Sequence, residues 1–283
     1  MTPPPLPPGR IVELPGRGRT FVREALAPGK PTVVLLHGWT ANADLNWFST
    51  FGALQQHVNV VAPDLRGHGR GVRSRRGFRM RDASDDVAAL LDALGIRRAI
   101  VVGYSMGGAV AQLLWRRHPE KVSGLVLCAT SAVFAESEQE RRWFAAMGAA
   151  SVASRFTPDV ARRALAGWVF ERRSDRELTE WATDELQRND WTAVLGAGSA
   201  LGRFDARPWL GEIDVPTATV LTRDDHVVAP RRQRELAQGI PRAVTFEVEG
   251  DHGVVAMDPA RFVPTLVRAV QHVAERVDLA AHA

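Results

Sequence analysis

One serine, set between two glycines, is the residue of this chain best placed to do chemistry. It lies in Gly103-Tyr104-Ser105-Met106-Gly107, a G-x-S-x-G pattern that also occurs in plain Gly-Ser loops. The β-branched run Ile100–Val102 precedes it and an apolar helical stretch, Ala109–Trp115, follows. This setting predicts a strand, a tight turn and a helix, with the hydroxyl projecting at the positive end of the helix. The pattern therefore favours a nucleophilic serine.

A serine nucleophile needs a general base within hydrogen-bond reach, and the chain offers 8 histidines. In an open parallel sheet the reactive loops gather at the carboxyl ends of the strands. His252 directly follows the predicted strand Val244–Val248, in a short loop. His226 follows the preceding strand, whereas His272 falls within the predicted last helix and His282 in the tail. We therefore expect His252 to be the base.

The base in turn needs a carboxylate to orient it, located between the serine and the histidine in the chain. The predicted strand Pro216–Leu221 is followed by two candidates, Asp224 and Asp225. Either could orient the imidazole, and the other would cap the loop or remain solvated. Position along the chain leaves both open.

Stabilising an oxyanion requires two donors, usually backbone N–H groups. Met106, the residue after the serine, is expected to supply one. Trp39, in His37-Gly38-Trp39 after the predicted strand Thr32–Leu36, is expected to supply the other. Trp39 and Met106 should also line the substrate pocket, and His37 is expected to be a structural histidine that bonds loop backbone. This chemistry requires no metal ion and no organic cofactor.

The elements that must position these groups alternate between strand and helix along most of the chain. Such alternation predicts an α/β fold with a mostly parallel sheet flanked by helices. The expected strands are Ile11–Leu14, Thr20–Arg23, Thr32–Leu36, Val58–Ala62, Ile100–Val102, Gly124–Ala129, Pro216–Leu221 and Val244–Val248. The expected helices of the core are Leu45–His57, Asp82–Leu94 with Gly95 as its cap, Ala109–His118, Arg231–Gln238 and Pro259–Val277.

The pattern changes between Val133 and Glu212, where several helices and no convincing strand are predicted. This segment is expected to be a helical cap inserted into a core made of residues 11–132 and 213–283, with a Pro-rich leader at 1–10. Substrate selection is expected to reside in the cap. Each of its aromatic side chains more simply buries the cap's own helices, although some could line an apolar pocket: Trp143, Phe144, Trp168, Phe170, Trp181, Trp191 and Trp209.

Composition narrows the class of protein. The chain has 283 residues, 45% hydrophobic and 24% charged, as in ordinary globular proteins. The longest apolar stretch is interrupted and too short for a membrane span, and the leader lacks the apolar core of a signal peptide. Cys128 is the only cysteine, so no internal disulfide forms and a cytoplasmic location is expected. The Arg-rich run Arg70–Arg81 is expected to be a solvated loop, because no nucleic-acid-binding motif accompanies it.

Together these motifs resemble the α/β-hydrolase fold superfamily from Thr32 to Val273. Val33–Trp39 looks like its H-G-x oxyanion loop, Pro63–Gly69 like its D-x-R-G-x-G turn, and Gly103–Gly108 like the elbow of the enol-lactonase, non-haem haloperoxidase and carboxylesterase branches. Asp225-His-Val-Val228 matches the D-x-x-V segment whose aspartate is the triad acid, so the resemblance favours Asp225. The chain departs from the family at Gly250-Asp-His-Gly253, where Asp251 precedes the histidine.

The resemblance implies a serine hydrolase that cleaves an ester through an acyl-enzyme, with Ser105, His252 and Asp225 as the triad. Its substrate would be a small ester or thioester with an apolar acyl group, with no nucleic acid partner. Haloalkane dehalogenases and epoxide hydrolases are disfavoured, because they carry aspartate where this chain has Ser105. The same triad would serve a C–C bond hydrolase, a lactonase or a perhydrolase. A non-catalytic ligand-binding protein on this fold is the less favoured reading.

Overall fold

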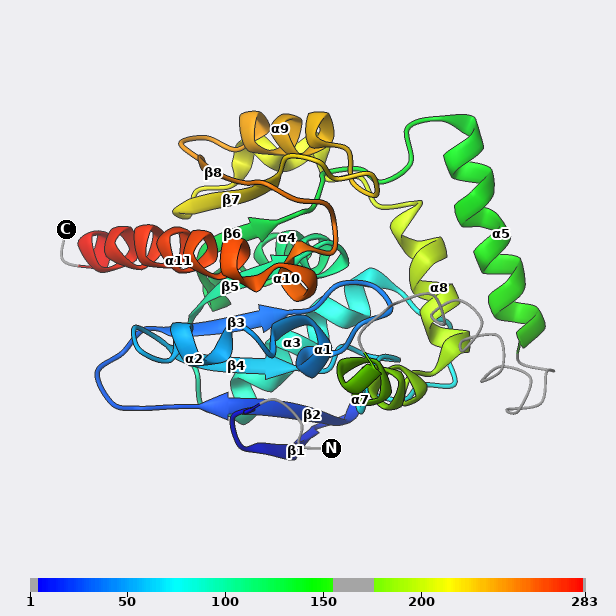
Figure 1. Cartoon of the computed structure of the whole chain (residues 1–283), viewed down its shortest axis with the longest axis horizontal. Helices are drawn as coiled ribbons and strands as arrows, with labels where there is room; N and C mark the ends of the chain where they lie inside the picture. Colours follow the sequence, from blue (N-terminus) through cyan, green and yellow to red (C-terminus); the bar gives the residue numbers. More distant parts are fainter. Residues whose placement is uncertain (1–4, 155–175, 282–283) are drawn as a thin grey trace.

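The computed structural model describes residues 5–154 and 176–281, which form a central sheet covered by helices (Figure 1). The sheet has eight strands in the order β1-β2-β4-β3-β5-β6-β7-β8. The pairs β1–β2 and β2–β4 are antiparallel and every other pair is parallel, which confirms the predicted α/β class. The strands are β1 Gly9–Leu14, β2 Gly18–Ala25, β3 Thr32–Leu36, β4 Asn59–Pro63, β5 Ala99–Tyr104, β6 Val122–Cys128, β7 Thr217–Thr222 and β8 Val244–Val248.

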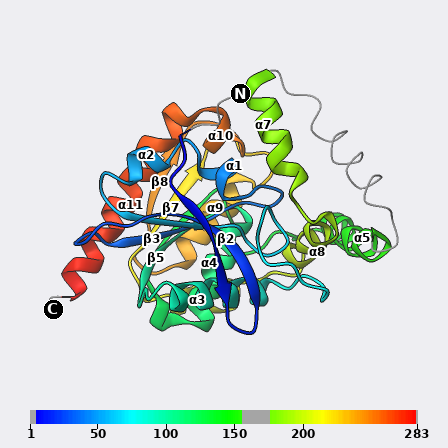
Figure 2. The same cartoon turned by 90° about the horizontal axis from the view of Figure 1, so that it is seen from below.

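Helices cover both faces of the sheet, as the view from below shows (Figure 2). The two faces bury separate hydrophobic clusters. The central strands contribute to both, which is why their sequences are continuous apolar runs rather than alternating ones. One face carries α3 Met80–Ala93, α4 Met106–Arg117 and α9 Pro230–Gly239; the other carries α1 Ala43–Trp47, α2 Phe51–Leu54 and α11 Pro259–Ala281.

The predicted helix Leu45–His57 is wrong as a single element. The chain forms α1 and α2 instead, because the N–H and the hydroxyl of Thr50 both donate to the carbonyl of Trp47 and end the first helix. Trp47 at the end of α1 and Phe51 at the start of α2 are both buried in the core. A four-residue helix after His252, α10 Val254–Met257, was not predicted. The single turn η1 Pro119–Lys121 follows α4.

The predicted leader is partly ordered. Leu6 packs against the core, and the carbonyl of Pro7 accepts a hydrogen bond from Arg23 at 2.9 Å. β1 begins at Gly9, two residues before the predicted strand. Residues 1–4 lie outside the described part of the chain.

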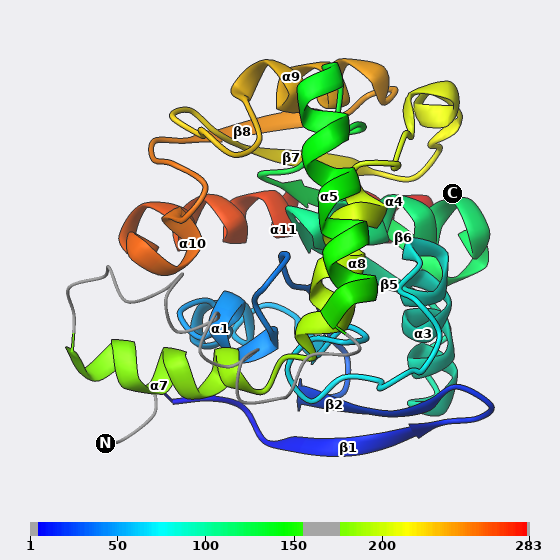
Figure 3. The ribbon, with the colours of Figure 1, turned by 90° about the vertical axis from the view of Figure 1, so that its right-hand side faces the viewer.

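Between residues 133 and 212 the described residues form helices, as predicted. These are α5 Glu138–Ser154, α7 Arg176–Gln187, α8 Trp191–Leu201 and the short 3₁₀ helix η2 Arg207–Glu212. In Figures 1 and 3, α5, α7 and α8 lie beyond the carboxyl ends of the parallel strands. The only strand-like pairing here is one bridge between Val133 and Asp205, within the described ranges. Across residues 5–154 and 176–281, every helix is too short or too polar to cross a bilayer.

Candidate active site

Ser105 occupies a strained turn between β5 and α4. Its backbone has φ 52° and ψ −115°, a left-handed conformation that non-glycine residues rarely adopt. The turn requires both flanking glycines, because a Cβ at Gly103 would lie 2.4 Å from the carbonyl oxygen of Gly107. A Cβ at Gly107 would lie 2.1 Å from the carbonyl oxygen of Leu36. The Ser105 N–H donates to the carbonyl of Cys128 at 2.9 Å, which ties the turn to β6.

His252 lies within hydrogen-bond distance of both the serine and an aspartate. Its Nε2 is 2.9 Å from Ser105 Oγ, and its Nδ1 is 2.8 Å from Asp225 Oδ2. A neutral imidazole with its proton on Nδ1 donates to the carboxylate and accepts from the serine hydroxyl. The Tyr104 hydroxyl donates to the His252 carbonyl at 2.8 Å and so ties the histidine loop to the end of β5. The sequence motif gave no signal for this contact.

The carboxylate of Asp225 is buried and accepts several hydrogen bonds besides that of the imidazole. Oδ1 accepts the N–H groups of Val227 and Val228, each at 2.8 Å. Oδ2 accepts the Thr222 hydroxyl at 2.7 Å and the Gln233 amide at 3.1 Å. Thr222 and Gln233 were not identified from the sequence. Thr222 lies only three residues before Asp225, and this proximity could have suggested it. Gln233 lies on α9, eight residues after Asp225, and no motif marks it.

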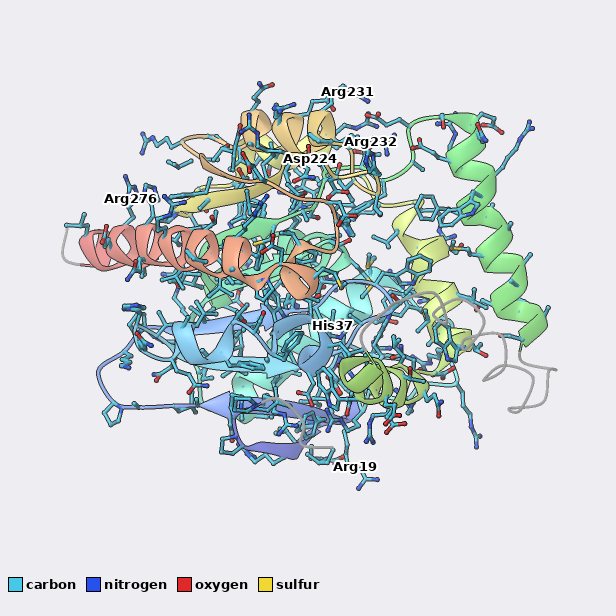
Figure 4. The ribbon with its side chains drawn as sticks, in the orientation of Figure 1. Arg19, His37, Asp224, Arg231, Arg232 and Arg276 are labelled. Atoms are coloured by element: carbon cyan, nitrogen blue, oxygen red, sulfur yellow. The ribbon has the colours of Figure 1, made fainter. Side chains whose placement is uncertain are left out.

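Hydrogen bonding keeps Asp225 ionised despite its burial. Burial opposes ionisation, but the hydrogen bond and charge of His252, with the bonds from Thr222 and Val228, hold the pKa of Asp225 below its ordinary value. Asp224, the competing candidate, is exposed at the β7–β8 edge of the sheet (Figure 4). Its carboxylate accepts the N–H of Gly250 at 3.2 Å, so it braces the histidine loop.

His37 joins two loops in the centre of the molecule (Figure 4). Its Nδ1 donates to the carbonyl of Gly38 at 2.8 Å and its Nε2 accepts the N–H of Leu65 at 2.9 Å. Burial, together with the charge of nearby His68, lowers the pKa of His37 to about 3, so the ring is neutral. These are the contacts expected of a structural histidine.

The two predicted oxyanion donors come from the loop after β3 and from the start of α4. A Cβ at Gly38 would lie 3.5 Å from that of Ser105, so this loop abuts Ser105. Among residues 5–154 and 176–281, no hydrogen bond engages the backbone N–H of Trp39. Met106 is the first residue of α4, where a backbone N–H has no partner within the helix. The Met106 side chain is fully buried in the core, whereas the half-buried Trp39 indole donates to the carbonyl of Val194 at 2.8 Å.

Two of the other histidines considered as bases lie within the described residues, and neither is hydrogen-bonded to Ser105. His226 is exposed in the loop after β7, and His272 lies on α11, edge-on to Phe246. His282 lies outside the described residues. In the part of the chain that the structure describes, no group of three or more His, Cys, Asp or Glu side chains has the geometry of a metal site.

Among the aromatic side chains of residues 133–212, one lies against Trp39 and others pack the segment against the core. Trp143, 53% exposed, meets Trp39 edge-on with ring centroids 6.3 Å apart. Trp209 instead stacks on Trp115 of α4 at 6.1 Å and buries the segment against the core. Trp181 meets Phe48 edge-on, and Phe144 meets Trp143 edge-on. The candidates Trp168 and Phe170 lie outside the described residues.

The sheet order, the turn at Ser105 and the loops at the strand ends agree with a sequence model of the α/β-hydrolase fold, which matches residues 31–256. The chain therefore belongs to the α/β-hydrolase fold family.

Individual relatives cover most of the chain. The pimeloyl–acyl-carrier-protein methyl ester esterase of Chromobacterium violaceum is 33% identical over 238 residues, which make up 79% of this chain and 87% of that protein. The poly(3-hydroxyalkanoate) depolymerase of Ectopseudomonas oleovorans is 27% identical over 277 residues, 94% of each chain. The crystal structure of the enol-lactonase from Burkholderia xenovorans LB400 matches with a TM-score of 0.72 and 25% identity, over 89% of this chain and 97% of that one. These relatives confirm the predicted resemblance to the esterase and enol-lactonase branches.

Proposed function

We propose that this protein is a serine esterase, with Ser105 as nucleophile, His252 as general base and Asp225 as the acid that orients the imidazole. The observation that supports this most directly is the continuous hydrogen-bond chain from Ser105 Oγ through His252 to Asp225 Oδ2. Side chains from three separate strand ends meet in it, which a plain Gly-Ser loop does not require. The esterases among its relatives support the same reaction class.

In the proposed reaction, Ser105 Oγ attacks the ester carbonyl while His252 Nε2 takes the hydroxyl proton. The negative charge that develops on the carbonyl oxygen is stabilised by the N–H groups of Trp39 and Met106. Collapse of this intermediate breaks the ester bond, and the imidazolium passes its proton to the departing alcohol. Water, deprotonated by His252, then attacks the acyl-serine and releases the acid. Asp225 stays ionised and stabilises the imidazolium in both halves.

We assign substrate selection to residues 133–212, acting as a helical cap between the core segments 11–132 and 213–283. The position of α5, α7 and α8 beyond the strand ends supports this assignment (Figure 3). Trp39 would contact the acyl group through its indole, with Trp143 next to it. The expectation that the Met106 side chain lines the pocket is wrong, because this side chain is buried in the core, so Met106 would contribute only its backbone N–H. A small ester with an apolar acyl chain is therefore the proposed substrate.

A fluorophosphonate probe tests the nucleophile, because it reacts covalently with an activated serine. The wild type should be labelled and should hydrolyse a short p-nitrophenyl ester, and Ser105→Ala should do neither. Ser84→Ala is the matched control, since Ser84 is also buried but lies on α3, where its hydroxyl donates to the carbonyl of Arg81. Equal labelling of wild type and Ser105→Ala would refute the assignment.

A lactonase is the second candidate, favoured by the structural likeness to an enol-lactonase at 25% identity. The same Ser105 attack would open a lactone ring, with the alcohol leaving group remaining attached to the acyl chain. A panel of linear esters and lactones of equal acyl length separates the two by their kcat/KM values. Labelling of Ser105 without turnover of either class would favour a C–C bond hydrolase, a perhydrolase or a ligand-binding protein.

A further inference from the structure

The loop after β3, residues 37–42, is held largely by a segment far away in the sequence. This segment, residues 185–194, joins the end of α7 to the start of α8. The Trp39 indole N–H donates to the carbonyl of Val194 at 2.8 Å. The Asn42 amide donates to the carboxylate of Glu185 at 2.7 Å. In Figures 1 and 3, α7 lies beside α1, which follows this loop.

Asn189 provides the central contact of this segment. Its side chain is 8% exposed, and its Nδ2 donates to the carbonyl of Thr40 at 2.7 Å. Its Oδ1 accepts the N–H of Gly69 at 2.7 Å. One buried amide therefore ties the loop after β3 to the turn after β4. The neighbouring Asp190 N–H donates to the carbonyl of Gly67 at 2.9 Å and fixes the segment against that turn.

The carbonyl that Asn189 holds belongs to a residue in an unfavourable conformation. Thr40 has φ 67°, in the left-handed region that a β-branched residue adopts only when its surroundings impose it. Rotation of Thr40 toward an ordinary conformation would swing the peptide units on either side. The unit on its amino side carries the Trp39 carbonyl, and the Trp39 N–H lies one peptide unit further back. The rotation would therefore reach this N–H, proposed to face the oxyanion, through the Trp39 backbone and turn it away from Ser105.

We propose that Asn189 is a positioning residue for the oxyanion hole. By bonding the Thr40 carbonyl it keeps this loop in its left-handed turn and keeps the Trp39 N–H directed at the reacting carbonyl. This proposal rests on the proposed function, because an oxyanion hole matters only if Ser105 attacks a carbonyl. If Asn189 has this role, residues 185–194 affect the rate of the chemical step and not only the affinity for substrate.

Asn189→Asp tests the proposal because it removes the donor to Thr40 and keeps an acceptor for Gly69. The chain offers a closely matched control in Asn59, which is also 8% exposed. Asn59 accepts the N–H of Ala27 and donates to the carbonyl of Lys30, at the amino end of β4 and far from Ser105. Asn59→Asp makes the same chemical change without touching the oxyanion loop. Both variants, the wild type and Ser105→Ala are assayed with a p-nitrophenyl ester and by thermal unfolding.

The expected result is a fall of kcat by about 10- to 100-fold in Asn189→Asp, with KM within about threefold of the wild type. Asn59→Asp should lower Tm comparably and leave kcat near the wild-type value. If Asn189→Asp does not fold, Asn189→Ser, whose hydroxyl is too short to bridge both loops, replaces it against Asn59→Ser. A kcat equal to that of the control, or a change confined to KM, overturns the proposal. Failure of the proposed function looks different, because Ser105-dependent turnover would then be missing from the wild type.

Discussion

Two buried histidines should make the protein sensitive to mild acid. His37 and His68 are fully buried, with ring centroids 5.3 Å apart. Burial lowers the pKa of His37 to about 3 and that of His68 to about 4. Between these values and the ordinary histidine pKa of about 6.5, the two rings are protonated in the unfolded chain and neutral in the folded chain. Their contribution to stability is therefore fully present above about pH 7.5 and is lost as the pH falls.

The size of the effect follows from the two pKa shifts. At pH 5 each histidine lowers the free energy of unfolding by about 2 kcal/mol relative to pH 7.5. Asp64 acts in the opposite sense, because burial raises its pKa to about 6. Its protonation in the folded state at pH 5 increases the free energy of unfolding by about 1 kcal/mol. The net loss is about 3 kcal/mol, a large share of the stability of a typical domain.

Urea unfolding followed by tryptophan fluorescence at pH 7.5 and pH 5 measures this loss. His68→Gln removes one titrating ring while its amide can still donate to the Arg66 carbonyl that His68 Nδ1 contacts. The pH-dependent loss should shrink to about 1 kcal/mol in this variant. The exposed His57 supplies the control, and His57→Gln should behave as the wild type. Equal pH dependence in His68→Gln and the wild type, or a flat wild-type profile, would refute the reasoning.

Three further substitutions have clear expected outcomes. Asp225→Asn should lower kcat on a p-nitrophenyl ester by about 10⁴-fold, because the imidazole loses the partner that fixes its tautomer, and an unchanged kcat would contradict that role. Tyr104→Phe should cost about 1 kcal/mol in urea unfolding, because it loses the hydroxyl bond to the His252 carbonyl, and should lower kcat more than it changes KM. Gly107→Ala should lower Tm or prevent folding, since its Cβ would lie 2.1 Å from a β3 carbonyl oxygen. Gly211→Ala, with open space around it, should fold normally by circular dichroism.

The sequence predicted two strands at their observed bounds, one in the centre of the sheet and one at its edge. Thr32–Leu36 and Val244–Val248 match the predicted bounds, and the glycine after α3 adopts the expected left-handed conformation. The break between α1 and α2 was not predictable from apolar spacing, because Trp47 and Phe51 keep a helical period across it. The four residues of α10 span about one helical turn, too few to show a period.

At the candidate site, the sequence identified the residue types and their order along the chain. The structure adds which side chains are buried and which distant residues they contact. Asp224 and Asp225 are neighbours of the same type, and only the resemblance separated them before burial and the bond to His252 were known. The contact of Tyr104 with the histidine loop joins residues 148 positions apart, so no local pattern could predict it. Asn189 was missed for the same reason, since its partners belong to two distant loops.

The hydrogen bonds from residues 185–194 to the loop after β3 also set where this chain can be recombined with its relatives. A graft that exchanges the helical segment but cuts through these ten residues would separate Trp39, Thr40 and Asn42 from their partners. Chimaeras joined before Glu185 keep those bonds and bring in foreign sequence only upstream of them. The crossover point, more than the choice of donor, should therefore decide whether a chimaera with an exchanged helical segment is active.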